Sequence, residues 1–110
     1  MITKTEDTFT LRLYLSGPID IDKQVMRKNC YEEGLCVTIE PTTFIYTGGE
    51  EEGYVVGFVN YPRFPTSADA LMRRARKVMA ELLDATHQHS ALLVSPKVTE
   101  WWTRRSEPAE

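Results

Sequence analysis

The stretch YVVGFVNY, residues Tyr54–Tyr61, decides the fold because it is the strongest strand signal in the chain. It combines valine, phenylalanine and tyrosine, which favour strands, and it contains no proline, so every backbone N–H can join a hydrogen-bond ladder. Both of its alternating sides are apolar, which predicts a central strand covered on two faces. The segments GGEEEG before it and PRFP after it mark its two ends.

A strand, a helix and a second strand are predicted upstream. TFTLRLYLS, residues 8–16, alternates leucine or phenylalanine with polar residues, as a strand with one buried face does. DIDKQVMRKNCYEE has apolar residues at helical spacing, and Gly34 follows where a helix would stop. LCVTIEPTTFIYT alternates again, and Pro41 within it indicates an edge strand.

A long helix and a last strand are predicted downstream. TSADALMRRARKVMAELLDAT, residues 66–86, begins with Thr66 or Ser67 as N-cap and carries an apolar stripe along one side. SALLVSPKVTEWW, residues 90–102, is the expected last strand, interrupted by Pro96. Trp101 and Trp102 would then point to opposite faces, one of them buried.

This order of elements predicts an α+β fold of the ferredoxin-like βαββαβ type, with a four-stranded antiparallel sheet and two helices on one face. The second and fourth strands lie at the edges of that sheet, which agrees with the positions of Pro41 and Pro96. We expect one domain over residues 1–104 and a frayed tail over residues 105–110.

Composition narrows the classes of function. The chain has 110 residues, a net charge of −3 and a pI of about 5.4, which disfavours a role in coating nucleic acid. No apolar run could cross a bilayer or act as a signal, so we expect a cytoplasmic protein with no membrane partner. Cys30 and Cys36 match no metal or redox spacing, and no cofactor or metal is expected.

The sheet face without helices is the expected binding surface. If the hairpin pairs Thr47 with Tyr54, this face presents alternate residues of the first three strands. A slip of one residue would instead expose Tyr54, Val56 and Phe58. The residues predicted to bind a ligand or partner are Arg12, Tyr14, Glu40, Phe44, Tyr46, Val59, Tyr61 and Arg63.

A sheet face this apolar is expected to be covered by another molecule, and three kinds of molecule are considered. The first is a second copy of the chain, in a homodimer through the open face, or another protein partner. The second is a small molecule or nucleotide handled by an enzyme, with Arg12 and Glu40 as polar anchors inside a ring of three tyrosines, Tyr14, Tyr46 and Tyr61. The third is single-stranded RNA.

The RNA alternative depends on a partial resemblance to the RNA recognition motif. LYLSG, residues 13–17, resembles the first-strand signature of that family, and GFVNY, residues 57–61, fits half of the third-strand signature. The resemblance implies base stacking on Tyr14 and on Phe58 or Tyr61. The acidic turn before that strand disfavours phosphate contacts.

The chain lacks the common catalytic motifs, and its two histidines, His87 and His89, are expected on the surface of a helix-to-strand turn. NYPRFP, HQHSALLVSP, Thr99 and Trp101 together resemble small bacteriophage and prophage proteins. That resemblance implies a phage context and no specific chemistry. The sequence therefore predicts a small non-catalytic binding or accessory protein.

Overall fold

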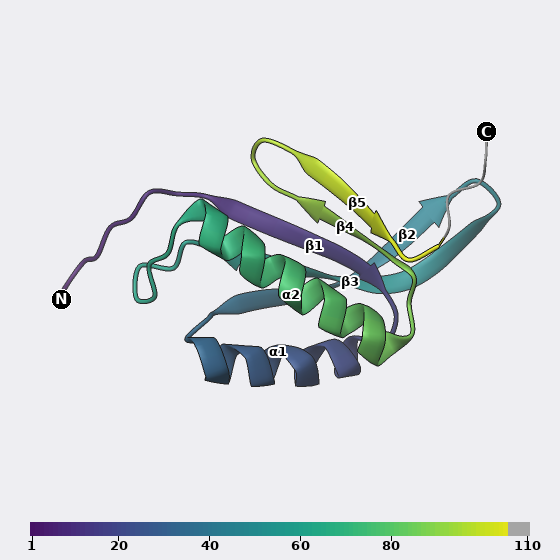
Figure 1. Ribbon diagram of the computed structural model, residues 1–110, viewed down its shortest axis with the longest axis horizontal. Coiled ribbons are helices and arrows are strands. Elements are labelled where there is room, and N and C mark those ends of the chain that lie inside the picture. The colour runs from purple at the N-terminus through teal and green to yellow at the C-terminus, as the bar shows by residue number, and fades with distance from the viewer. Residues whose placement is uncertain (106–110) are drawn as a thin grey trace.

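The computed structural model describes residues 1–105 and contains one five-stranded sheet with two helices (Figure 1). The elements are β1 (Thr10–Ser16), α1 (Ile19–Glu33), β2 (Val37–Tyr46), β3 (Gly49–Val59), α2 (Ala68–Thr86), β4 (Ser90–Val94) and β5 (Thr99–Thr103). All neighbouring strands are antiparallel, in the order β2-β3-β1-β4-β5. Both helices pack on the same face of this sheet.

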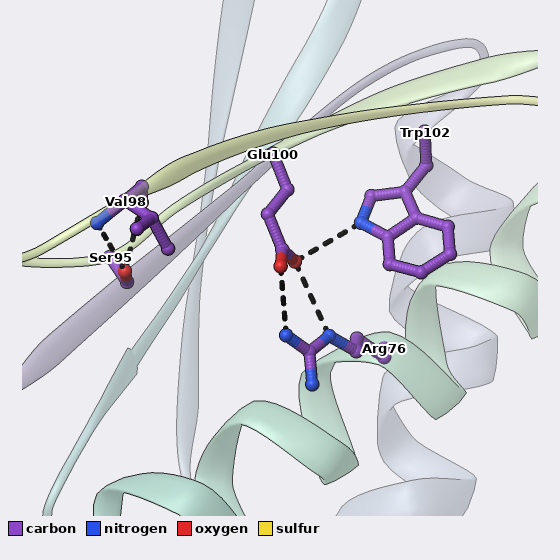
Figure 2. A network of polar contacts seen from close by, with 5 residues as sticks. All are labelled: Arg76, Ser95, Val98, Glu100 and Trp102. Carbon is purple, nitrogen blue, oxygen red and sulfur yellow. Dashed lines mark hydrogen bonds and ion pairs between the residues drawn. The ribbon is translucent and has the colours of Figure 1, made fainter.

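The predicted four-stranded ferredoxin-like arrangement is wrong, because the segment taken as the last strand forms two strands. Pro96 lies in a tight turn between β4 and β5 instead of within an edge strand. The turn is closed by Ser95, whose backbone N–H donates to the Val98 carbonyl at 2.9 Å. The Ser95 hydroxyl donates to the same carbonyl at 2.8 Å (Figure 2). The Val98 N–H donates back to the Ser95 hydroxyl at 3.1 Å. The fifth strand follows directly from this turn.

The two helices begin and end where the sequence predicts. Gly34 ends α1 in the left-handed conformation, with φ of 60°, and its N–H donates to the Cys30 carbonyl. Ser67 is the N-cap of α2, where its side chain accepts a hydrogen bond from the Ala70 N–H. Among residues 1–105, no helix is long and apolar enough to cross a membrane.

The core lies between the sheet and the helices. It is built from the leucines of β1, alternate residues of β3, and the predicted stripe of α2. The fully buried members are Leu13, Tyr54, Val56, Leu71, Ala75, Leu82 and Leu93. Truncating one of the leucines to alanine would cost about 2–5 kcal/mol, since each removal leaves a cavity in a close-packed interior.

The β2–β3 hairpin pairs in a different register from the one assumed, but its side chains lie on the predicted faces of the sheet. Tyr54 pairs with Pro41 instead of Thr47, because the turn is tight and Tyr46 pairs with Gly49. The difference is an even number of residues, so the side chains keep their predicted sides. Tyr54 and Phe58 are buried against the helices, as the favoured alternative predicts.

Asp22 in the first turns of α1 is the exceptional charged residue of the core. Its side chain is fully buried, and neither carboxylate oxygen has a hydrogen-bond partner among residues 1–105. Burial raises the pKa of Asp22 to about 7, against a small opposing effect of Lys23. Within the described part of the chain, the buried Tyr54 hydroxyl also has no hydrogen-bond partner. Burial, followed by the nearby Asp22 carboxylate, raises the pKa of Tyr54.

Asp22→Asn should change how stability depends on pH. Between the ordinary pKa of 3.8 and the folded value of about 7, the folded state keeps a proton that the unfolded state has released. Asp22 therefore makes the protein less stable as the pH rises through this window, and the penalty is constant above it. We expect the free energy of unfolding of the variant at pH 8 to exceed that of the wild type by up to about 4 kcal/mol.

Urea unfolding of both proteins from pH 3 to pH 8 measures this difference. Other carboxylates affect the two proteins equally, so the difference between the two curves isolates Asp22. Parallel curves across the whole range would contradict the assignment of the raised pKa to Asp22.

Candidate functional site

The open face of the sheet presents two rows of side chains that cross all five strands. One row contains Thr38, Gly57, Arg12, Val94 and Thr99. The next row contains Glu40, Val55, Tyr14, Leu92 and Trp101. Each row combines one charged residue with apolar neighbours, and no helix covers either of them. This surface can therefore hold a ligand with both apolar and charged parts.

A hollow of about 240 Å³ lies in the first row, over Gly57. Its wall is formed by β1, β2 and β3 and by Tyr61, which lies two residues after β3. The lining residues on the open face are Thr10, Arg12, Thr38, Val59 and Tyr61, with Cys36 at the rim. The missing side chain of Gly57 is what leaves this part of the sheet unfilled.

Gly57 differs from Gly53, the other glycine of β3 that pairs with both neighbouring strands. At Gly53 a Cβ would lie 2.2 Å from the Leu15 carbonyl oxygen and 2.6 Å from the Phe44 ring, so the neighbours already occupy this space. At Gly57 the close neighbour is the Thr38 hydroxyl, at 2.4 Å, which is the end of a side chain that can rotate. Gly53 is thus required by packing, whereas Gly57 mainly provides open space.

Arg12 is the main cation of the hollow. Interaction with the Tyr14 side chain, followed by the Glu40 carboxylate, raises the pKa of the Arg12 guanidinium. The guanidinium is exposed and has no ion-pair partner among residues 1–105. It is therefore available to a carboxylate or phosphate group of a ligand.

Tyr61 closes one end of the hollow and begins the proline-bracketed loop. The buried Asn60 holds this loop, because its side chain donates to the Asp7 carbonyl and accepts from the Thr66 N–H. The ring of Phe64 stacks on Tyr61 with centroids 6.0 Å apart, and Arg63 lies over the Phe64 ring. The loop therefore presents Tyr61 on a rigid support.

The structure brings together five of the eight residues predicted for the site and separates three. Arg12, Val59 and Tyr61 line the hollow, and Tyr14 and Glu40 lie in the neighbouring row. Phe44 packs edge-on against Tyr14 at 6.5 Å, which supports that ring without reaching the hollow. Tyr46 lies at the β2–β3 turn, and Arg63 lies over the Phe64 ring, so neither of them lines the hollow.

These positions test the two ligand hypotheses. Tyr46 pairs with Gly49 at the start of β3, whereas Tyr61 lies two residues past the end of β3, so the three tyrosines do not form a ring. Phe58 is only 2% exposed, so it cannot stack on a base. Of the positions considered for RNA, Tyr14 and Tyr61 remain on the open face.

Two residues of this surface were missed by sequence reasoning. Trp101, 59% exposed, lies beside Leu92 in the same row as Tyr14. Trp102 is on the opposite face, as the alternation predicts, but it is also exposed, so the expectation that one tryptophan is buried is wrong. Cys36 was given no place in the predicted binding surface, and it is exposed at the rim of the hollow. The pattern around Cys36 offered no signal for this.

The histidines lie where they were predicted. His87 is the C-cap of α2 and His89 is in the turn before β4, and both are exposed. Across residues 1–105, no three His, Cys, Asp or Glu side chains are grouped closely enough to hold a metal ion.

Comparison with known proteins gives a relationship in fold. No family model and no curated protein matches the sequence. Among solved structures, the chain is similar to a phage SAM lyase in complex with S-methyl-5'-thioadenosine, with a TM-score of 0.71 and 12% identity over 94% of this chain and 95% of that one. The apo state of a phage SAM lyase matches with the same TM-score and identity over 98% and 99%.

This likeness corrects one prediction and supports another. A non-catalytic accessory protein was expected, and that expectation is wrong on this finding, because the fold shared over nearly the whole of both chains is that of an enzyme. The phage origin of these structures agrees with the resemblance to phage proteins. At 12% identity, the shared property is the fold.

Alanine at Gly53 and at Gly57 should have different effects on stability. Gly53→Ala forces a methyl group into backbone and ring atoms, and we expect a loss of about 2–3 kcal/mol. Gly57→Ala needs only a rotation of Thr38, and we expect a change below about 0.5 kcal/mol because a strand also favours alanine over glycine. Urea unfolding measures both, and equal losses would show that Gly57 is also held by packing.

Proposed function

We propose that this chain is a lyase that binds S-adenosylmethionine at the hollow over Gly57 and releases S-methyl-5'-thioadenosine. The observation that carries the proposal is the unpaired Arg12 guanidinium beside the unfilled Gly57 position, on a fold shared with a SAM lyase. It replaces the expected accessory protein with one of the alternatives from the sequence, an enzyme that handles a small molecule or nucleotide.

The charges around the hollow complement this substrate. S-adenosylmethionine carries a positive sulfonium and, in its amino-acid part, a carboxylate and an ammonium group. Arg12 can bind the carboxylate through a two-pronged contact, which a planar guanidinium suits. The Glu40 carboxylate lies close enough to Arg12 to influence its pKa, and it can attract the sulfonium. The Tyr61 ring offers an apolar surface for the adenosine part.

The chemistry of the reaction fits a site without a catalytic dyad. The bond that breaks joins the sulfonium sulfur to the four-carbon amino-acid part, and its electron pair goes to the sulfur. The leaving group is then a neutral thioether that needs no proton, so no general acid is required. The substrate's own carboxylate oxygen can form the new bond to the carbon of the amino-acid part as the bond to sulfur breaks, which closes a lactone ring. This route releases no proton and consumes no water.

The contribution of the protein is then mainly orientation. If the carboxylate closes the ring, it must be held behind the carbon–sulfur bond, and holding two reacting groups in line lowers the barrier by removing their freedom to rotate. Arg12 is the residue that would fix the carboxylate. The neighbouring apolar residues Val55 and Val59 would limit access of water to the sulfonium.

Removing Arg12 should abolish most of the activity. Purified protein is incubated with S-adenosylmethionine, and S-methyl-5'-thioadenosine is measured by liquid chromatography and mass spectrometry against a sample without protein. We expect product from the wild type and at least about 10-fold less from Arg12→Ala, because the carboxylate is no longer oriented. Arg27→Ala, which removes an exposed arginine of α1, is the matched control and should keep full activity.

Gly57→Val gives a second test of the same location. The valine side chain would fill the hollow, so we expect loss of binding of S-methyl-5'-thioadenosine in calorimetry, with the far-ultraviolet circular dichroism spectrum unchanged. A wild type that neither binds this product nor forms it above the protein-free rate would overturn the proposal. Full activity of Gly57→Val would place the site elsewhere on the molecule.

A further inference from the structure

The end of the β2–β3 hairpin, residues 43–52, forms an arm that extends past the rest of the sheet. β1 ends at Ser16, opposite Gly53, so the arm has no third strand beside it. Its helix-side surface carries Ile45, which is 80% exposed, next to Glu50 and Glu52. No carboxylate of the arm forms an ion pair within residues 1–105. The arm thus carries an exposed apolar residue next to carboxylates that form no ion pair within residues 1–105.

A groove of about 770 Å³ lies between the first half of α2 and the β4–β5 turn. Its floor is apolar and includes Leu11, Met72 and Val98, of which Val98 is 53% exposed. Arg73 and Lys97 lie at its rim, and neither forms an ion pair within residues 1–105. The groove is thus an apolar surface bordered by free positive charge.

The remaining charges of the groove do not cancel this character. Arg76 is held by Glu100 through two contacts, of 2.8 and 3.3 Å, and Glu100 also accepts from the Trp102 ring N–H (Figure 2). That pair is neutral, and it fixes β5 to α2. Asp69 is the only carboxylate among the described lining residues, set against Arg73 and Lys97.

The arm and the groove of one chain cannot meet. The arm begins beyond Ser16 at one end of β1, whereas the β4–β5 turn lies beyond the pairing of Arg12 with Val94 at the other end. Figure 1 shows the two at opposite ends of the sheet, and the long axis of the molecule is 54 Å. Only the arm of another molecule could enter the groove.

We propose that the chain associates with a second copy of itself by docking the acidic arm, residues 43–52, of one molecule into the groove of the other. Ile45 contacts the apolar floor, and Glu50 and Glu52 face Arg73 and Lys97. Each subunit gives one arm and accepts another, so the interface joins two different surfaces. This contact leaves the open face of the sheet free.

Charge reversal at the two surfaces tests the proposal, with mass measured by sedimentation over a range of concentrations. We expect the wild type to self-associate, and the association to weaken as salt is added. Glu50→Lys with Glu52→Lys gives a basic arm facing a basic groove, and Arg73→Glu with Lys97→Glu gives an acidic arm facing an acidic groove. Each double variant should associate at least about 10-fold more weakly. Arg27→Glu with Lys28→Glu on α1 is the control and should behave as the wild type.

Mixing the two double variants is the decisive step, because each arm then finds a groove of opposite charge on the other protein. We expect association to return in the mixture and in a chain that carries all four reversals. Circular dichroism on each variant separates weak association from unfolding. A monomeric wild type, association that survives the reversals, or a mixture that stays monomeric would each overturn the proposal. Association that survives the reversals would favour the homodimer through the open sheet face.

Discussion

The antiparallel pairing of β1 with β3 is the constraint on which the rest of the structure depends. Successive side chains of a strand point to opposite faces, so the three leucines of β1 can be buried together in only one way. Once Leu13 pairs with Val56, Arg12 must lie beside Gly57 on the other face. The same pairing that buries the core therefore creates the hollow and places a cation at its wall. Core and site are two consequences of one register.

Much of this could be predicted from the sequence, and the failures have physical causes. The faces of β3 were predicted even though the hairpin register was wrong, because only an odd shift exchanges the faces. The fifth strand could not be predicted in this way. Pro96 forbids a continuous ladder, and the same signal fits an interrupted edge strand or a turn. The bonds between Ser95 and Val98 decide for the turn, and they exist only once β4 and β5 are folded together.

The site was only partly predictable for a different reason. Catalytic groups are recognised in a sequence by fixed spacings, and the lyase activity that we propose, with a neutral thioether as leaving group, needs few such groups. What such a site needs is space and a fixed charge. Space is signalled in the sequence by a glycine alone, and Gly53 and Gly57 are indistinguishable there. Their difference appears only in the folded sheet, where the Phe44 ring and the Leu15 carbonyl fill the space at Gly53, whereas the Thr38 hydroxyl, which can rotate away, is the close neighbour at Gly57.

The two edge strands, β2 and β5, are protected in different ways against pairing with another chain. An unpaired edge strand invites pairing with another chain, and proteins protect such edges with proline, charge or a cover. On β2, Pro41 removes a donor, and the three glutamates on the adjoining β3 give the extended hairpin a charge that repels other acidic edges. On β5, Glu100 accepts hydrogen bonds from Arg76 of α2 and from the Trp102 ring N–H, which binds the strand to the helix. Negative charge that discourages edge pairing with another copy is also charge that a basic groove can bind. The glutamates that discourage edge pairing between two copies therefore favour docking of the arm in the groove.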